Sequence, residues 1–138
     1  MAAGDREVAI LSEGVAILEP ALVPYGFKYA SGDRGYASGG PSAEAAFTRK
    51  RQVLSLHFRH SLGLVTYRWR GVELSHRDYL RGVGARGAYP GFSDDPLDGF
   101  RHLRSDLEGP LQGWVAGRYR AFAAVAKVAE APPTSRFP

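Results

Sequence analysis

The sequence predicts an α+β fold with an N-terminal helix, an antiparallel β-meander of four to five strands, and C-terminal helices packed on one face of the sheet. Two changes in the spacing of apolar residues indicate this architecture. Near both ends of the chain apolar residues recur every three to four positions, which is the period of a helix, whereas residues 44–74 alternate apolar and polar side chains, as strands do. No repeat and no domain boundary is visible, so we expect one domain.

The composition is that of one folded domain. The chain has 138 residues, of which 44% are hydrophobic and 23% are charged, values typical of a globular domain with a single core. We expect a single α+β domain over residues 1–131 and a mobile C-terminal tail over residues 132–138. The absence of cysteine excludes disulfides, thiolate zinc sites and a cysteine nucleophile.

The N-terminus is unlike a secretory signal. Residues 1–7 include two acidic side chains where a signal needs a basic start and then an apolar run. We expect no membrane contact, on the ground that no segment approaches the roughly 20 apolar residues of a membrane span. A cytoplasmic location is therefore predicted.

The net charge of +4, with an isoelectric point near 9.6, comes mostly from arginine. Such a balance favours anionic partners but is too small to require nucleic acid. An alternative is that the arginine content, beside abundant alanine and glycine, reflects the base composition of the genome.

A helix is predicted to begin at Asp5, a good N-cap residue. Pro20 and Pro24 should bend or end it, and a short first strand is expected at residues 27–29. Residues 31–42 are rich in glycine and serine but lack the Gly-Lys-Ser/Thr ending of a phosphate-binding loop, so they are predicted to be a flexible hairpin connection. The apolar face of the helix comprises Val8, Leu11, Val15 and Leu18.

The alternating segment predicts the strands of the meander. Strands are expected at residues 45–50, 53–60, 64–70 and 72–74, and residues 61–63 supply the turn of the central hairpin. One set of side chains in the central strands is predicted to face the core, namely Leu54, Leu56, Phe58, Val65, Tyr67 and Trp69.

Two capping patterns predict where later helices begin. Ser75 is followed three residues later by Asp78, as in a capping box. Asp95, Pro96 and Asp98 form a second start signal, because proline at the first helical position lacks only an amide that the first turn leaves unpaired. One helix with the stripe Leu97, Phe100, Leu103 and Leu107 should end at Gly109-Pro110, and a last amphipathic helix should carry Leu111, Trp114, Val115, Phe122 and Val125.

The polar face of the sheet is the first candidate binding surface. If it is functional, its arginines should bind carboxylates or phosphates, and the alternative is an ordinary solvated face. Because Tyr67 and Trp69 have the parity of the core face, bases would find no aromatic platform there, which favours an acidic protein partner over nucleic acid. A register shift of one residue would overturn this argument. The basic side chains predicted to share this face are His57, Arg59, Arg68 and Arg70.

The irregular segment of residues 84–94 is the second candidate surface. Long connections without secondary structure are uncommon in compact domains and often functional. Aromatic residues and arginine dominate protein interfaces when they are exposed, whereas the alternative is that the aromatics anchor the segment to the core. The partner-binding residues predicted here are Arg86, Tyr89 and Phe92.

The histidines do not form a recognised metal or catalytic pattern. His57 and His60 should point to opposite faces of one strand, so they would not chelate one ion. Asp98 and His102 could share a helix face, but capping already explains the aspartate. We therefore assign no metal, no cofactor and no catalytic residue.

A hydrolytic triad of Ser75, His76 and Asp78 is rejected, because adjacent residues at a helix start point in different directions and the serine is needed for the cap. His76 with Tyr79 or Asp78 would instead make a small acid–base site. A small enzyme is thus the third interpretation of the chain.

Several segments resemble those of small bacterial α+β domains, among them immunity-type proteins that neutralise toxins. The resemblance rests on Tyr25-Gly26-Phe27-Lys28, the strands Leu54–Arg59 and Leu64–Tyr67, and Tyr89-Pro90-Gly91-Phe92 before a capped helix. It implies a compact inhibitor that binds a toxin or effector. Many such inhibitors are acidic, whereas this chain is basic, which argues against a nuclease as the partner.

The functional prediction is therefore a non-catalytic protein-binding module with an acidic protein partner. The alternative is a nucleic-acid-binding accessory protein that uses the basic sheet face.

Overall fold

The computed structural model describes residues 5–37, 40–58, 62–85 and 95–129, and it confirms the predicted α+β fold. The elements are the helix α1 (Asp5–Leu22), the 3-10 turn η1 (Val23–Tyr25), the strands β1 (Lys28–Ala37), β2 (Gly40–Arg49), β3 (Gln52–Phe58), β4 (Leu62–Trp69) and β5 (Val72–Ser75), and the helices α2 (His76–Gly82), α3 (Asp98–Glu108), α4 (Gln112–Val115) and α5 (Tyr119–Ala129).

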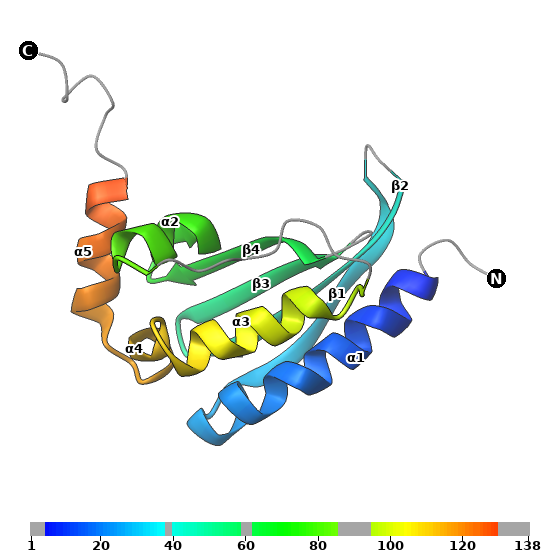
Figure 1. Ribbon diagram of the computed structural model, residues 1–138, viewed down its shortest axis with the longest axis horizontal. Coiled ribbons are helices and arrows are strands. Elements are labelled where there is room, and N and C mark those ends of the chain that lie inside the picture. The colour runs from blue at the N-terminus through cyan, green and yellow to red at the C-terminus, as the bar shows by residue number, and fades with distance from the viewer. Residues whose placement is uncertain (1–4, 38–39, 59–61, 86–94, 130–138) are drawn as a thin grey trace, which may run out of the picture.

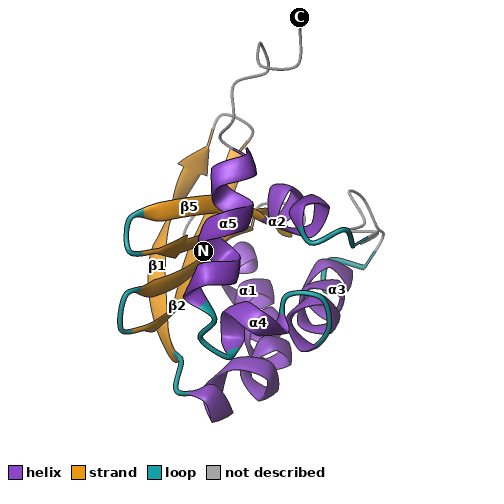
Figure 2. Cartoon of the chain, turned by 90° about the vertical axis from the view of Figure 1, so that its left-hand side faces the viewer, coloured by secondary structure: helices purple, strands orange, loops and turns teal. Residues whose placement is uncertain are grey.

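The strands form one antiparallel sheet in the order β1-β2-β3-β4-β5, so the predicted meander is present. Figures 1 and 2 show the helices on one side of this sheet. Helices α1 and α3 lie side by side, and α2 and α5 pack together beside β4 and β5. No described helix covers the opposite side of the sheet, which we call the outer face.

The predicted core register of the central strands is confirmed. Leu54 pairs with Tyr67, and Leu56 pairs with Val65, across β3 and β4. All four side chains are buried. Their burial against the helices, worth about 25 cal/mol per Å² of apolar surface, supplies the main favourable free energy of this layer.

Helix α1 does not end at Pro20 but continues to Leu22. Ala21 and Leu22 are buried in the core, and this burial offsets the backbone hydrogen bond that proline removes. The 20 residues from Arg6 to Tyr25 are long and apolar enough to span a membrane by length and composition, which corrects the expectation that no segment approaches this size. Core helices pass the same test, and α1 packs against α3 and β2.

Residues 31–42 do not form the predicted flexible connection, because the strands β1 and β2 run through most of this segment. Their pairing continues as far as Ala37 and Gly40, with a shift in register between Ser31 and Arg34. The ladder of backbone hydrogen bonds needs no particular side chain, so a segment rich in glycine and serine can extend a hairpin whose other end is fixed by the core.

The helix starts are confirmed in part. Ser75 caps α2, since its Oγ accepts a hydrogen bond from the Asp78 amide at 3.1 Å. Asp95 caps a turn instead of the helix: its Oδ1 accepts from the Leu97 amide at 2.9 Å, and α3 begins only at Asp98.

The predicted last helix is two helices, α4 and α5. Gly117 separates them with φ of +89°. This left-handed conformation, which glycine adopts without steric cost, ends the first helix and redirects the chain. The predicted tail, residues 132–138, lies outside the described residues.

Candidate functional site

The outer face of the sheet carries two of the predicted basic residues, His57 and Arg68, but each lies beside a carboxylate. His57 Nε2 is 3.8 Å from Glu44 Oε1 on the neighbouring strand. Arg68 Nη2 is 3.3 Å from Glu73 Oε2 on the other side. Each of these two residues therefore has an acidic side chain opposite it on a neighbouring strand, Glu44 for His57 and Glu73 for Arg68. The third predicted member, Arg59, lies outside the described residues.

Arg70 does not share this face with Arg68. Strand β4 ends at Trp69, and Arg70 and Gly71 form the turn to β5, so the alternation of side chains stops one residue earlier than predicted. Arg70 has φ of +52°, and its Cζ lies 4.5 Å from the ring centroid of Tyr119 in α5. The turn thus directs this arginine toward the helices.

Four basic residues meet instead at one end of the sheet, which we call the basic hairpin end: Arg49, Lys50, Arg51 and Arg70. It consists of two turns, one between β2 and β3 and one between β4 and β5. They lie close together because alternate turns of a meander are at the same end of the sheet. The Arg70 amide donates to the Arg51 carbonyl at 3.3 Å and so joins the two turns. The four residues line an open pocket of about 520 Å³ together with Gln52, Trp69, Ala116 and Gly117.

Arg49 fixes the base of this pocket. Its Nη1 donates to the Tyr25 carbonyl at 2.8 Å, its Nε donates to Gln52 Oε1 at 2.9 Å, and its Cζ lies 4.3 Å from the centroid of the Phe27 ring. Partial burial lowers the pKa of the Arg49 guanidinium. Gln52 in turn is buried and donates to the Trp114 carbonyl at 2.7 Å. These contacts join the hairpin to η1 and α4.

The other three cations are exposed and unpaired with carboxylates in the described part of the chain. None of the ion pairs found between described residues includes Lys50, Arg51 or Arg70. Lys50 and Arg70 both occupy the left-handed region at φ of +52°, which is uncommon for residues other than glycine. Arginine forks and the lysine ammonium bind carboxylates and phosphates, so this pocket is suited to an anion.

Three of these four residues, Arg49, Lys50 and Arg51, are not among those predicted from the sequence to bind a partner. The run Arg49-Lys50-Arg51 between two alternating segments, and Arg70 before Gly71 at the next such boundary, were the available signal. The alternation of side chains in a strand assigns residues to the two faces of the sheet, whereas this pocket lies at the end of the sheet.

His76 belongs to a buried chain of polar groups with Tyr67 and Asp106, and not to the predicted acid–base site with Tyr79 or Asp78. Its Nδ1 is 2.8 Å from the Tyr67 hydroxyl, and its Nε2 is 2.9 Å from Asp106 Oδ2. Since a carboxylate only accepts, Nε2 carries a proton. In the neutral imidazole, which burial favours, Nδ1 then accepts from the Tyr67 hydroxyl. The imidazole is 4% exposed. Neither Tyr79 nor Asp78, the partners expected from the sequence, makes these hydrogen bonds.

The stability of the fold should fall in mild acid because of His76. Burial lowers its pKa, and Asp106 opposes this shift only in part. The unfolded chain therefore takes up the proton first as the pH falls below about 6.5. The contribution of His76 to the free energy of unfolding is fully present above this pH. It is lost as the pH falls toward the pKa of the folded protein, by at most about 1.4 kcal/mol per pH unit.

Urea unfolding between pH 7.5 and pH 5 measures this loss for the natural protein and for His76→Gln, in which we expect a smaller slope. His102→Gln, on the exposed side of α3, is the control and should keep the natural slope. An equal slope in all three proteins would show that His76 does not carry the effect.

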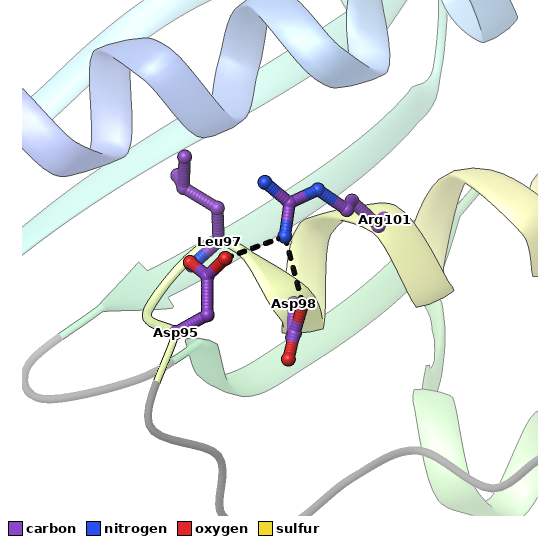
Figure 3. A network of polar contacts seen from close by, with 4 residues as sticks. All are labelled: Asp95, Leu97, Asp98 and Arg101. Carbon is purple, nitrogen blue, oxygen red and sulfur yellow. Dashed lines mark hydrogen bonds and ion pairs between the residues drawn. The ribbon is translucent and has the colours of Figure 1, made fainter.

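Asp95 and Asp98, at the start of α3, both contact the same arginine. Figure 3 shows Arg101 between the carboxylates of Asp95 and Asp98, with its Nη1 2.8 Å from Asp95 Oδ2 and 2.8 Å from Asp98 Oδ1. The hydrogen bond from Arg101 lowers the pKa of Asp95. Within the described ranges no three histidine or acidic side chains gather to hold a metal ion.

The three predicted binding residues of the second candidate surface, Arg86, Tyr89 and Phe92, lie outside the described residues. Their role in partner binding stays a prediction.

No family model, curated protein or solved structure matches the chain. The choice of function therefore depends on the chemistry of its own residues.

Proposed function

We propose that the protein is a non-catalytic protein-binding module that recognises an acidic surface of a partner protein through the basic hairpin end. The observation that supports this proposal is the convergence of Lys50, Arg51 and Arg70 on one pocket without a carboxylate among the described residues. On the outer face, by contrast, His57 and Arg68 already have acidic neighbours. A cluster of exposed cations attracts an acidic partner and raises the rate at which the two proteins associate.

The aromatic residues at this end favour a protein over nucleic acid. Trp69 and Tyr67 are buried, and Arg70 lies over Tyr119. Single-stranded nucleic acids usually stack their bases on exposed rings. Arginine and tyrosine are also the residues that dominate protein interfaces.

One observation supports nucleic acid as the second candidate. Tyr25, whose carbonyl binds Arg49, exposes 45% of its surface. An exposed tyrosine whose carbonyl binds one arginine of the basic hairpin end would offer a stacking position near phosphate contacts.

As the form of this module we propose an immunity-type inhibitor that neutralises a bacterial toxin or effector, acting in the cytoplasm. The resemblance of the chain to such domains motivates this choice. The burial of His76, the residue best suited to acid–base chemistry, agrees with an inhibitor that acts by binding.

Affinity purification from the native host, with and without nuclease treatment, tests the proposal. We expect one protein to remain bound after nuclease digestion. Recovery of nucleic acid alone, or of proteins that are all lost on digestion, would contradict it. In that case affinity should also fall steeply with salt for many unrelated sequences, because counterions are released from the phosphates.

A further inference from the structure

We infer that the pocket at the basic hairpin end takes two or more carboxylates of a short acidic segment of the partner. This inference rests on the proposed function and names the group that the module recognises. We assign these carboxylates to glutamate and aspartate side chains, and the test below separates them from a terminal carboxylate.

The size of the pocket argues for a segment rather than for one group. Its volume of about 520 Å³ lies within the roughly 300–1,000 Å³ of pockets that hold whole ligands. One carboxylate would leave most of this space to water, whose share of the liquid is about 30 Å³ per molecule.

The charges argue for more than one carboxylate. Lys50, Arg51 and Arg70 face the pocket with no acidic partner in the described part of the chain. A single carboxylate would leave two like charges close together in a partly desolvated complex, which disfavours binding. An acidic segment satisfies all three cations.

The guanidinium groups are prepared for this role in different ways. Arg49 is already bound to the Tyr25 carbonyl and to Gln52, so it forms a fixed wall. Arg70 is braced by the ring of Tyr119, which reduces the side-chain entropy that binding removes. We therefore expect the planar guanidinium groups of Arg51 and Arg70 each to bind a carboxylate through two parallel hydrogen bonds.

The test measures binding of a fluorescein-labelled peptide of alternating glutamate and serine by fluorescence anisotropy, with a twin in which glutamine replaces glutamate. We expect binding of the glutamate peptide only. Arg51→Lys with Arg70→Lys keeps the charge but removes both forks, and affinity should fall on the order of tenfold. Arg68→Lys on the outer face is the matched control and should bind as the natural protein does.

Two arms identify the source of the carboxylate. A peptide with an amidated C-terminus should bind equally well if side chains are recognised, whereas preference for a free C-terminus would assign the pocket to a terminal carboxylate. A single-stranded oligonucleotide that binds more tightly than the peptide at about 0.15 M salt would overturn the inference.

Failure of the inference is distinct from failure of the proposed function. If both peptides bind equally, or if the double lysine variant binds the glutamate peptide unchanged, the pocket does not grip carboxylates. A nuclease-resistant partner held by that variant would then leave the protein-binding proposal standing. If no protein partner is captured at all, the proposed function itself is wrong.

Discussion

Replacement of Gly14 by alanine is expected to destabilise the protein by about 1–3 kcal/mol, as overpacking of a core does. Gly14 lies in α1 against α3, where an added Cβ would come within 2.4 Å of Phe100 Cδ1. The Phe100 side chain is completely buried and its ring is stacked against Phe58, with 6.0 Å between ring centroids. Because the ring has no free space, α1 and α3 must move apart.

The expected loss of stability is opposite to the usual effect of this substitution, since alanine normally stabilises a helix by up to about 1 kcal/mol relative to glycine. Gly113 in α4 is the matched control, because an added Cβ would meet Arg118 Cδ at the ordinary distance of 3.7 Å. Urea unfolding should show a loss for Gly14→Ala and no loss for Gly113→Ala. Equal stability of Gly14→Ala and the natural protein would refute the close packing of α1 on α3.

Replacement of Trp114 by alanine should cost about 3–5 kcal/mol, the usual cost of removing a large buried aromatic side chain. Trp114 is completely buried below the basic hairpin end. Its ring stacks on Phe27 with 5.1 Å between ring centroids and meets Tyr67 edge-on at 5.2 Å. Alanine would remove both ring contacts and leave a cavity in their place.

Trp114→Phe is expected to cost much less. Its ring keeps the stacking on Phe27, and no hydrogen bond is lost, since the indole Nε1 of Trp114 has no partner among the described residues. Denaturant unfolding of both variants gives the comparison. A phenylalanine variant as unstable as the alanine variant would contradict this account, because the ring stacked on Phe27 would then contribute nothing to stability.

The meander and the capped helix could be predicted because local signals agree with the fold. The alternation at Leu54, Leu56 and Tyr67 corresponds to the buried side of the sheet, and Ser75 caps α2 as its spacing to Asp78 indicates. In each case the side chain that forms the sequence pattern also makes the structural contact, either burial in the core or the hydrogen bond of the cap.

Other elements depend on contacts that no local pattern contains. Pro20 stays within α1 because Ala21 and Leu22 are buried by distant residues. The glycine-rich part of β1 and β2 is held as strand by its ladder, and Gly117 divides an apparently continuous stripe by its backbone angle. Tertiary context decides all three.

The sequence indicated a basic site but not its place. The arginine content favours an anionic partner, which stays a prediction, and strand parity assigned the contact to Arg68 on the outer face. Parity does not extend into a turn, so it misplaced Arg70, and it gave no weight to Lys50 and Arg51. The meeting of two turns at one end of the sheet follows from topology.

The most direct test of the central claim is the affinity for the captured partner after reversal of charge at the basic hairpin end. Lys50→Glu with Arg51→Glu should weaken binding at least about a hundredfold, because two attractive contacts become repulsive. Arg68→Glu with Arg77→Glu makes the same change of net charge elsewhere on the exposed surface, and it should leave the affinity within a few-fold of the natural value. Equal loss in both double variants, or no loss in either, would contradict the assignment of binding to the basic hairpin end.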